Sequence, residues 1–583
     1  MPVEFATTPG GMLLPLAVLV PFAGVLAGLA IGGRHVVRVA AVTIAAGLGI
    51  AAAMAATMLH SGQSMTYLLG GWAPPLGIAL RADDLTLAML PVFAVVIGGV
   101  ALYARADFGV PQGSEGTRSS TMYWLLLLAV WGSLNLVLVS GDLFTLYVAL
   151  ELLTFAGVPL ACLAGEAETL RAALRYLVYA LAGSVLYLLG AVLLYGECGT
   201  LDVALLSARL QPSPAAWAAL ALMTAGLLAK TALYPLHLWL PPAHAGAPPA
   251  ASAVLSALVV KGSFVIVIRL WFDVAPGLPG FAAAQMLAGL GAAAILFGSV
   301  VALRQQRLKL LIAYSTLAQI GYLFLMFPLA FDEAAGELVR GAALTAGTLQ
   351  ALAHATAKAA MFMAAGLIYK ACGHDRLAEL GGAARAVPLT VLAFVLGGVA
   401  LMGVLPSGAY LAKKLLVDAA DATGQWWWEW VLQAGGFLTT SYVVLVLAQA
   451  LRPGGEAPAP RSPVPRLQEL AALGLALCSF ALSLAALVGP LRSEMFASAL
   501  SPKEIGAMLV TLAGGAALAL AFAPQLPALP AAIGAMAQPL RRATLAIGGA
   551  FERTDTGLRR WPVAVLALLA VALALGAAMR AGA

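Results

Sequence analysis

Charged residues are scarce in this sequence. Of its 583 residues, only 10% are Asp, Glu, Lys or Arg and 62% are hydrophobic, whereas soluble globular chains carry about 25% charged residues. So few charges cannot cover the water-facing surface of a soluble protein of this length, and they also exclude a disordered chain and a nucleic-acid-binding domain. We therefore expect the chain to lie in a lipid bilayer, with no nucleic acid as a partner.

Cysteine is rare as well. The four cysteines lie far apart and form no CxxC pair, so the spacing patterns of zinc sites and iron–sulfur clusters are missing. The sequence also contains no dinucleotide-binding fingerprint and no convincing bis-histidine haem pair. We expect neither a metal ion nor a cofactor in this chain.

Apolar runs long enough to span a bilayer, which takes about 20 helical residues, fill most of the chain. Sixteen such runs lie at 12–32, 37–59, 84–104, 122–139, 142–164, 173–196, 215–238, 250–272, 281–303, 309–330, 341–369, 387–420, 429–451, 468–489, 505–523 and 562–581. We therefore expect an all-α polytopic membrane protein with about 16 transmembrane helices.

Basic residues are distributed unequally between the loops. Loops after odd-numbered runs hold 20 Lys and Arg residues, whereas loops after even-numbered runs, together with the C-terminus, hold six. Because Lys and Arg collect in cytoplasmic loops, we expect both termini outside. The Pro-rich loop 452–466 and the polar segment 524–560 are then cytoplasmic. From Leu540 onward, this segment is expected to form either a basic amphipathic helix on the membrane surface or an irregular loop.

The remaining six of the 32 basic residues fall inside apolar runs. Arg269 lies near the end of a run, from which its long side chain is expected to reach the membrane interface. The other five are Lys230, Lys261, Lys358, Lys413 and Lys414. A lysine at the bilayer centre costs at least about 2.5–3.5 kcal/mol, so it normally faces a polar pathway or a partner. Glu151 lies at mid-depth in its run, and we expect it to pair with Lys230 as a switch.

Two of these lysines lie near a proline. Pro235 follows Lys230 by five residues, and Pro406 precedes Lys413 by seven. Proline removes a backbone donor and interrupts a helix, and paired broken helices in corresponding places indicate inverted repeats around an ion site. The expected parts are N-terminal helices at 1–121, a first five-helix repeat at 122–272, a second at 281–451, and C-terminal helices with a cytoplasmic connecting segment at 452–583.

Histidines accompany the lysines. His354 and Lys358 are four residues apart and share one helix face, with Gln350 one turn earlier. His237 and His244 follow the seventh run on the cytoplasmic side, where imidazoles that titrate near neutral pH suit proton uptake; such a histidine is also often only a hydrogen-bonded polar group. The set favours a proton pathway, because the protonation of each group depends on its neighbours.

Several segments resemble one family of membrane proteins. GDLFTLYVALE at 141–151, GLLAKTALYPLHLWLPPAH at 226–244 and RQQRLKLLIAYSTLAQIGY at 304–322 resemble the antiporter-like subunits of respiratory complex I, Mrp-type sodium/proton antiporters and membrane-bound hydrogenases. HATAKAAMFMAA at 354–365 is similar to the family's eleventh helix. The resemblance covers about residues 65–450 and, in appearance, is strongest to the D-type Mrp subunit. It implies two inverted five-helix bundles within fourteen helices, so the two spans after residue 490 are additional.

The resemblance also implies roles for single residues. The matching pathway positions are Glu151 in helix five, Lys230 in broken helix seven, Lys261 in helix eight, His354 and Lys358 in helix eleven, and Lys413 in broken helix twelve. His237, His244, Lys309 and Lys414 are candidates for proton uptake or accessory roles. PSGAYLAKK departs from the family's usual context, so Lys414 could take the role of Lys413, and WLPPAH lacks the acidic residue often found after helix seven.

The function that the resemblance implies is proton translocation by one membrane subunit of a multisubunit complex in a bacterial inner (cell) membrane. Its expected partners are other integral membrane subunits, protons, the lipid bilayer and, in a cation/proton antiporter, sodium. A second interpretation is a proton-pumping subunit of a quinone oxidoreductase or hydrogenase complex whose redox centres lie in other subunits. A third is a solitary solute transporter. Whether the complex is an enzyme is left open by the sequence.

Overall fold

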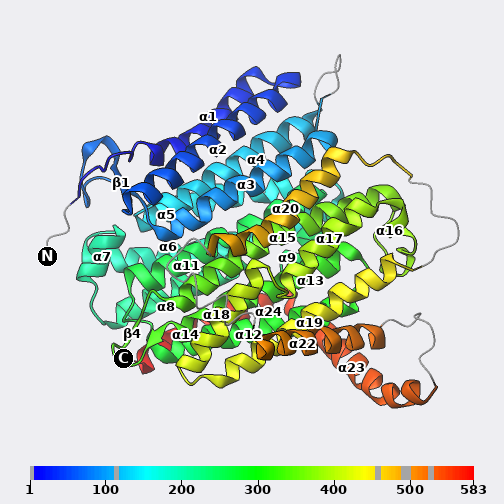
Figure 1. Cartoon of the computed structure of the whole chain (residues 1–583). Coiled ribbons are helices and arrows are strands. Elements are labelled where there is room, and N and C mark those ends of the chain that lie inside the picture. Colours follow the sequence, from blue (N-terminus) through cyan, green and yellow to red (C-terminus); the bar gives the residue numbers. More distant parts are fainter. Residues whose placement is uncertain (1–4, 111–116, 453–460, 487–500, 523–530, 583) are drawn as a thin grey trace.

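The computed structural model describes residues 5–110, 117–452, 461–486, 501–522 and 531–582. Long helices that run roughly side by side make up almost all of this part (Figure 1). The N-terminal part contains α1 (Leu13–Ile31), η1 (Gly33–His35), α2 (Val36–Ser61), β1 (Met65–Leu68), η2 (Leu69–Gly71), β2 (Ala79–Ala82) and α3 (Asp84–Asp107). The two strands pair antiparallel at one end of the bundle.

The central part holds the segments for which the sequence predicts two repeats. The first stretch contains α4 (Arg118–Val139), α5 (Leu143–Ala161), α6 (Ala167–Cys198), α7 (Val203–Arg209), α8 (Pro214–Thr231), α9 (Leu240–Gly246), α10 (Pro249–Val254), η3 (Leu255–Val259), α11 (Val260–Ile268) and η4 (Arg269–Val274). The second contains α12 (Gly280–Arg304), α13 (Leu308–Phe324), α14 (Met326–Leu329), β3 (Phe331–Asp332), β4 (Glu337–Leu338), α15 (Ala342–Cys372), η5 (Leu377–Glu379), α16 (Ala383–Ala386), α17 (Pro388–Leu401), α18 (Gly408–Ala422) and α19 (Trp426–Ala450).

The C-terminal part packs back onto this core. It contains α20 (Arg466–Ala486), α22 (Pro502–Phe522), α23 (Ala531–Leu558) and α24 (Trp561–Ala581). α20 lies against α15 and α17, α22 against α19, and α24 against α8 and α12. For residues 540–560, the sequence predicted either a helix or an irregular loop. This segment is helical as far as Leu558, and the helix begins earlier than expected, at Ala531. Part of the Pro-rich loop 452–466, residues 453–460, lies outside the described residues.

Both ends of the described chain lie at the same end of the bundle, beside β1, α7 and β4 (Figure 1). α16 and the turn between α1 and α2 lie at the opposite end, which we call the basic end because Arg304, Arg307 and Arg376 also lie there. This arrangement agrees with an even number of crossings. The assignment of the basic end to the cytoplasm follows from the basic-residue count and stays a prediction.

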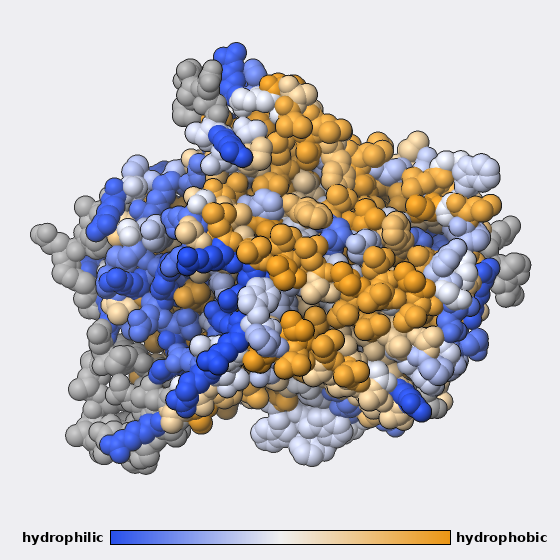
Figure 2. Space-filling model, turned by 180° about the vertical axis from the view of Figure 1, so that it is seen from behind, coloured by the Kyte–Doolittle hydropathy of each residue, from blue (hydrophilic) through white to orange (hydrophobic). Residues whose placement is uncertain are grey.

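Fourteen described helices are long and apolar enough to cross a membrane. The seventh and twelfth expected runs are not among them, because each is interrupted: α8 ends at Thr231 before Pro235, and α17 ends at Leu401 before Pro406. Figure 2 shows a broad hydrophobic face with hydrophilic residues gathered toward both of its sides, as a bilayer-spanning protein requires. The count of about 16 crossings stays a prediction.

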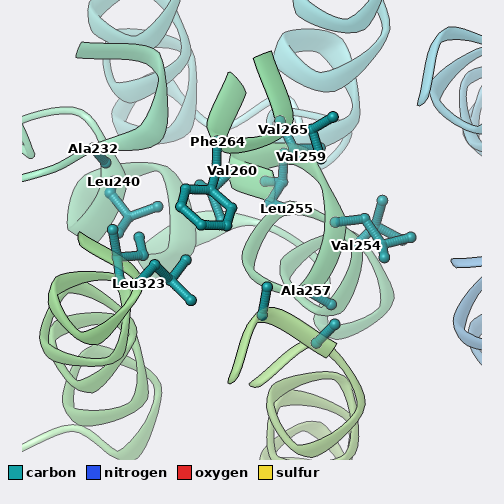
Figure 3. Packing of buried hydrophobic residues seen from close by; sticks show 14 of the residues in the cluster. Ala232, Leu240, Val254, Leu255, Ala257, Val259, Val260, Phe264, Val265 and Leu323 are labelled. Carbon is teal, nitrogen blue, oxygen red and sulfur yellow. The ribbon is translucent and has the colours of Figure 1, made fainter. Parts of the chain in front are cut away.

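The centre of the bundle is packed with apolar side chains. Figure 3 shows Leu255, Val260 and Phe264 of the η3–α11 segment near Leu240 of α9 and Leu323 of α13. All of them are fully buried. η3 is a π-helical turn, and such turns often mark functional sites within helices. The turn ends two residues before the buried Lys261.

Candidate functional site

Glu151 and Lys230 are in contact. Lys230 Nζ, at the end of α8, lies 3.2 Å from Glu151 Oε1 on α5. The ammonium also donates to Thr154 Oγ1 at 2.9 Å and to the Leu150 carbonyl at 3.3 Å. Ser184 of α6 donates its hydroxyl to the same Glu151 oxygen. Three helices thus enclose a hydrogen-bonded carboxylate–ammonium pair, the arrangement in which a buried ion pair is tolerated.

The Glu151–Lys230 pair lies where α6 and α8 approach each other closely. Gly183 and Gly226 face each other, and a Cβ atom on Gly183 would lie 2.6 Å from the Gly226 carbonyl oxygen and 3.4 Å from Lys230 Cγ. Small residues allow transmembrane helices to approach in this way. Ser184, the residue after Gly183, is thereby brought to Glu151.

The break after α8 follows from its sequence. Ala232 adopts a left-handed conformation with φ +60°, and Pro235 cannot continue a helical ladder. The carbonyl of Ala229 accepts hydrogen bonds from the Ala232 amide at 3.2 Å and from the Trp239 indole at 2.9 Å, so this carbonyl at the helix end is paired. The chain therefore leaves the helix one residue after Lys230 without an unpaired Ala229 carbonyl.

A series of hydroxyl groups continues from this pair toward Lys261. Thr231, next to Lys230, donates to Ser263 Oγ on α11 at 2.9 Å. Lys261 Nζ is fully buried and donates to the Ser256 carbonyl in the π-helical turn at 2.6 Å. Ser256 Oγ lies 2.9 Å from Thr316 Oγ1 of α13, so the series passes from α8 through α11 to α13.

Lys358 of α15 is the next buried lysine. Its ammonium donates to the hydroxyl of Ser315, which neighbours Thr316 on α13. His354, one turn before Lys358, is fully buried, lies within electrostatic reach of Lys261 and Lys358, and has no hydrogen-bond partner for either ring nitrogen among the described residues. His354 and Lys358 were expected to share one helix face. Both side chains are directed into the bundle.

Amides and hydroxyls extend the series toward α19. Gln350 of α15 donates to Gln319 Oε1 of α13 at 2.9 Å. Gln319 donates in turn to Thr439 Oγ1 at 3.3 Å and to Tyr442 OH at 3.4 Å, both on α19. Gln350 was expected on the polar face of its helix, and Gln319 is its partner across the helix interface.

Lys413 and Lys414 line one cavity of about 30 Å³ together with Gln433, Glu504 and Thr511. Lys413 Nζ donates to Gln433 Oε1 of α19 at 2.9 Å. Lys414 pairs instead with Asp418 on its own helix and with Glu504 of α22, the latter at 3.4 Å. The two neighbours therefore differ: Lys413 has a neutral partner, whereas Lys414 is held between two carboxylates.

The other three accessory candidates, beside Lys414, lie in different surroundings. His237 donates or accepts at Nε2, 3.1 Å from Asp555 of α23. His244 is buried, stacks on Phe362 with ring centroids 4.7 Å apart, and has no partner for either ring nitrogen in the described chain. Lys309, at the start of α13, donates to the Ala247 carbonyl.

Arg269 lies near the end of its helical segment, and its side chain is buried within the protein. That it reaches the membrane interface stays a prediction. It donates to both carboxylate oxygens of Asp83, with Nη2–Oδ1 at 2.8 Å, and to Asp273 at 3.0 Å. Burial alone would raise the pKa of Asp83, but the charge of Arg269 and its hydrogen bonds hold that pKa well below its ordinary value. Arg269 is therefore one centre of an ion-pair cluster at the end of the bundle, which apolar periodicity could not reveal.

Sequence reasoning missed most of the neutral groups in this series. They are Ser184, Thr231, Ser256, Ser263, Ser315, Thr316, Gln319, Gln433, Thr439 and Tyr442. The two glutamines could have been found by the reasoning used for lysine, since a buried amide inside an apolar helix also needs a partner. Hydroxyls give no such signal, because Ser and Thr can bond to their own helix backbone.

The site contains no metal-binding arrangement within the described ranges, where no group of three His, Cys, Asp or Glu side chains is placed to hold an ion. The four cysteines are unpaired with one another.

Residues 140–439 match the family described as NADH:quinone oxidoreductase/Mrp antiporter, transmembrane region. The chain is 34% identical over 421 residues to the N-type subunit of NADH-quinone oxidoreductase from Desulforudis audaxviator, which covers 71% of this chain and 81% of that protein. It is 26% identical over 387 residues to the D-type subunit of a Na(+)/H(+) antiporter from Bacillus subtilis, covering 65% and 74%. The higher of these two identities is thus with the N-type protein, although the sequence motifs look most like the D-type one.

Solved structures show the same fold. A chain of the Mrp complex from Dietzia sp. DQ12-45-1b matches with a TM-score of 0.73 and 25% identity, covering 86% of this chain and 99% of that one. A chain of the membrane-bound sulfane sulfur reductase, an archaeal respiratory membrane complex, matches with a TM-score of 0.73 at 24% identity, which concerns the fold alone. The protein described here belongs to the NADH:quinone oxidoreductase/Mrp antiporter transmembrane family and is an antiporter-like, polytopic membrane protein.

Proposed function

We propose that the protein is a proton-translocating subunit of a multisubunit complex in a bacterial cell membrane. The observation that carries this proposal is the series of buried titratable and hydrogen-bonding groups that runs from Glu151 to Lys413 across α5, α8, α11, α13, α15, α19 and α18. Ionisable residues inside a membrane protein are costly and normally mark ion or proton paths.

The Glu151–Lys230 pair would act as the switch. When Lys230 holds its proton, Glu151 and Thr154 bind the ammonium at 3.2 and 2.9 Å. If the ammonium passes its proton on toward Thr231 and Lys261, Glu151 loses its counter-charge and favours uptake of the next proton. Protonation of one site is then coupled to deprotonation of the next, as in any strongly interacting pair.

The buried histidines support a hydrated path through the centre. Buried polar groups nearly always have a hydrogen-bond partner, yet the ring nitrogens of His244 and His354 find none among the described side chains and backbone groups. Lysines flank both rings. Such nitrogens are suited to bind water or to receive a proton during translocation.

We further propose that residues 122–272 and 281–451 form two inverted repeats, with 1–121 and 452–583 as flanking parts. The support is the correspondence of the two breaks: Lys230 lies one residue before the end of α8, and Lys413 lies in the first two turns of α18, just after the break. Each repeat would then contribute one lysine beside a broken helix.

For the coupling, we favour cation/proton antiport, with other integral membrane subunits of the complex as partners. Relatives named as Na(+)/H(+) antiporter subunits and the fold match to an Mrp complex support it. The second candidate is a proton-pumping subunit of a quinone oxidoreductase, which the 34% identity to an NADH-quinone oxidoreductase protein favours. Sodium-dependent proton exchange by the purified complex supports the first, and co-purification with redox-centre subunits supports the second.

The test of proton translocation uses Glu151→Gln and Lys230→Ala. Both remove a charge from the pair without adding one to the lipid, so the protein should still insert, whereas proton flux in sealed membrane vesicles, followed with a pH-sensitive dye, should be lost. Glu168→Gln is the matched control, because Glu168 is an exposed carboxylate at the start of α6. Wild-type flux in both pair variants would contradict the proposal.

A further inference from the structure

α23 is docked on the core at the basic end of the bundle. Glu552 on α23 pairs with Arg304 at the end of α12, with Nη2–Oε2 at 3.1 Å. Gly548, one turn earlier, lets the Arg304 side chain approach, since a Cβ atom there would lie 2.8 Å from Arg304 Cδ. The C-terminal half of α23 is therefore fixed against the core and does not merely lie on a membrane surface.

Asp555 is the residue of α23 that enters the core. It is 6% exposed, and its two carboxylate oxygens face three side chains. Oδ1 lies 3.1 Å from His237 Nε2, and Oδ2 lies 2.7 Å from Tyr314 OH and 2.8 Å from Arg559 Nη2. These partners come from the break after α8, from α13 and from the next turn of α23, so Asp555 connects the appended helix to the break beside Lys230.

The charge of Asp555 determines which ring nitrogen of His237 is free. Burial would raise the pKa of Asp555, but the hydrogen bond with His237 and the charge of Arg559 hold it below its ordinary value. An ionised carboxylate only accepts hydrogen bonds, so Nε2 must carry a proton, and the lone pair of the neutral imidazole lies on Nδ1. Nδ1 is buried and has no side-chain hydrogen-bond partner among the described residues, and the backbone of Pro235 lies within hydrogen-bonding reach of the ring.

We propose that Asp555 is a positioning residue for proton uptake, which holds His237 with its Nδ1 ready to accept a proton and stabilises the imidazolium that results. The step is balanced: a proton from the basic end binds the Nδ1 lone pair, and its release toward the Glu151–Lys230 pair restores the neutral ring. The inference rests on the proposed function. It assigns to the C-terminal appendage a part of the pathway rather than only a structural role.

Because of the groups that surround His237, the stability of its imidazolium form depends on the charge of Asp555. The ring is enclosed by the Tyr234 and Phe297 rings, with centroids 5.6 and 5.3 Å away. The charges that face it are those of Asp555 and Arg559, and Arg175 of α6 faces the same two residues. Without the Asp555 charge, the charge that faces His237 is that of Arg559, and the ring is enclosed by two aromatic rings, so a positive ring is disfavoured.

The experiment measures proton flux against pH in sealed vesicles that contain the whole complex. Asp555→Asn keeps an oxygen that can accept from Nε2 but removes the charge, so the pH of half-maximal flux should move down by about one unit or more, as expected for loss of one neighbouring opposite charge. Asp555→Glu should restore the wild-type profile. Glu552→Gln, a carboxylate one turn away that also pairs with an arginine, is the matched control and should leave the profile unchanged.

His237→Gln tests the same step without altering α23. It should remove the pH-dependent limb that Asp555→Asn shifts, and Asp555→Asn should add no further effect in the His237→Gln background. An unchanged profile in Asp555→Asn or His237→Gln, an equal shift in Glu552→Gln, or additive losses in the double variant would overturn the inference. Because Glu151→Gln is measured in the same vesicles, loss of flux there with a wild-type Asp555→Asn profile rejects only this inference, whereas wild-type flux in Glu151→Gln rejects the proposed function.

Discussion

At the scale of single residues, the buried lysines differ in their partners. Lys230 contacts a carboxylate, whereas Lys261, Lys358 and Lys413 bond to a carbonyl, a hydroxyl and an amide respectively. A lysine with a neutral partner can lose its proton without leaving an unpaired buried carboxylate. These three positions therefore suit transient occupation by a proton, and Lys230 suits control of its movement.

Lys413 and Lys414 give a prediction at this scale. Lys413→Ala should abolish proton flux, because it removes the titratable group opposite Gln433 on α19. Lys414→Ala should reduce flux at most about twofold, since Lys414 is held by Asp418 and Glu504 and lies about 100° away around the helix. Flux in vesicles and the amount of assembled protein are measured for both variants. An inactive Lys414→Ala with a normal Lys413→Ala would mean that the pathway runs through Lys414.

At the scale of elements, the pathway depends on helices that are interrupted or unusually close. The breaks after α8 and α17 were predictable, because Pro235 and Pro406 forbid a continuous ladder. The contact of α6 with α8 was not predictable, since glycine is frequent throughout the sequence and nothing in the local pattern shows which glycines face each other. The π-helical turn before Lys261 likewise has no local signature.

Gly183 tests the importance of the α6–α8 contact. Gly183→Ala places a methyl group 2.6 Å from the Gly226 carbonyl, so it should separate the helices, cost about 1–3 kcal/mol of stability and weaken the Ser184–Glu151–Lys230 cluster. Gly196→Ala on the same helix is the control, because a Cβ atom there meets open space and alanine favours a helix. Thermal unfolding in detergent should show a lower Tm for Gly183→Ala alone, and proton flux should fall with it. Equal Tm values for the two variants would contradict the packing argument.

At the scale of the whole molecule, the fold class and the pathway residues could be predicted from the free-energy cost of placing charged side chains in lipid. A lysine or glutamate in lipid is expensive wherever the fold places it, so Glu151 and Lys230 stood out in the sequence, and the structure brings them to 3.2 Å. Asp555 was missed because a carboxylate in a polar, basic segment looks like part of a solvated helix face. Its role depends on how the C-terminal part packs back on the core, and a local pattern does not contain that information.

The topology can be tested on α24. Thr554 is exposed on α23, and Ala581 is exposed at the end of α24. In a variant without the native cysteines, Thr554→Cys should react with a membrane-impermeant maleimide only from the cytoplasmic side, and Ala581→Cys only from outside. This follows because α24 is long and apolar enough to cross the membrane and the basic residues favour the cytoplasm. Labelling of both from one side would mean that α24 does not cross.

The measurement that tests the proton pathway most directly is proton flux through vesicles containing Lys358→Met. Lys358 lies in the middle of the series and is fully buried, and methionine fills a similar space without a titratable group. Lys370→Met on the same helix is the control, because Lys370 lies at the basic end and pairs with Asp107 at the surface. The proposed pathway predicts that Lys358→Met assembles normally and carries no protons, while Lys370→Met carries them at the wild-type rate. Wild-type flux in Lys358→Met would contradict the pathway.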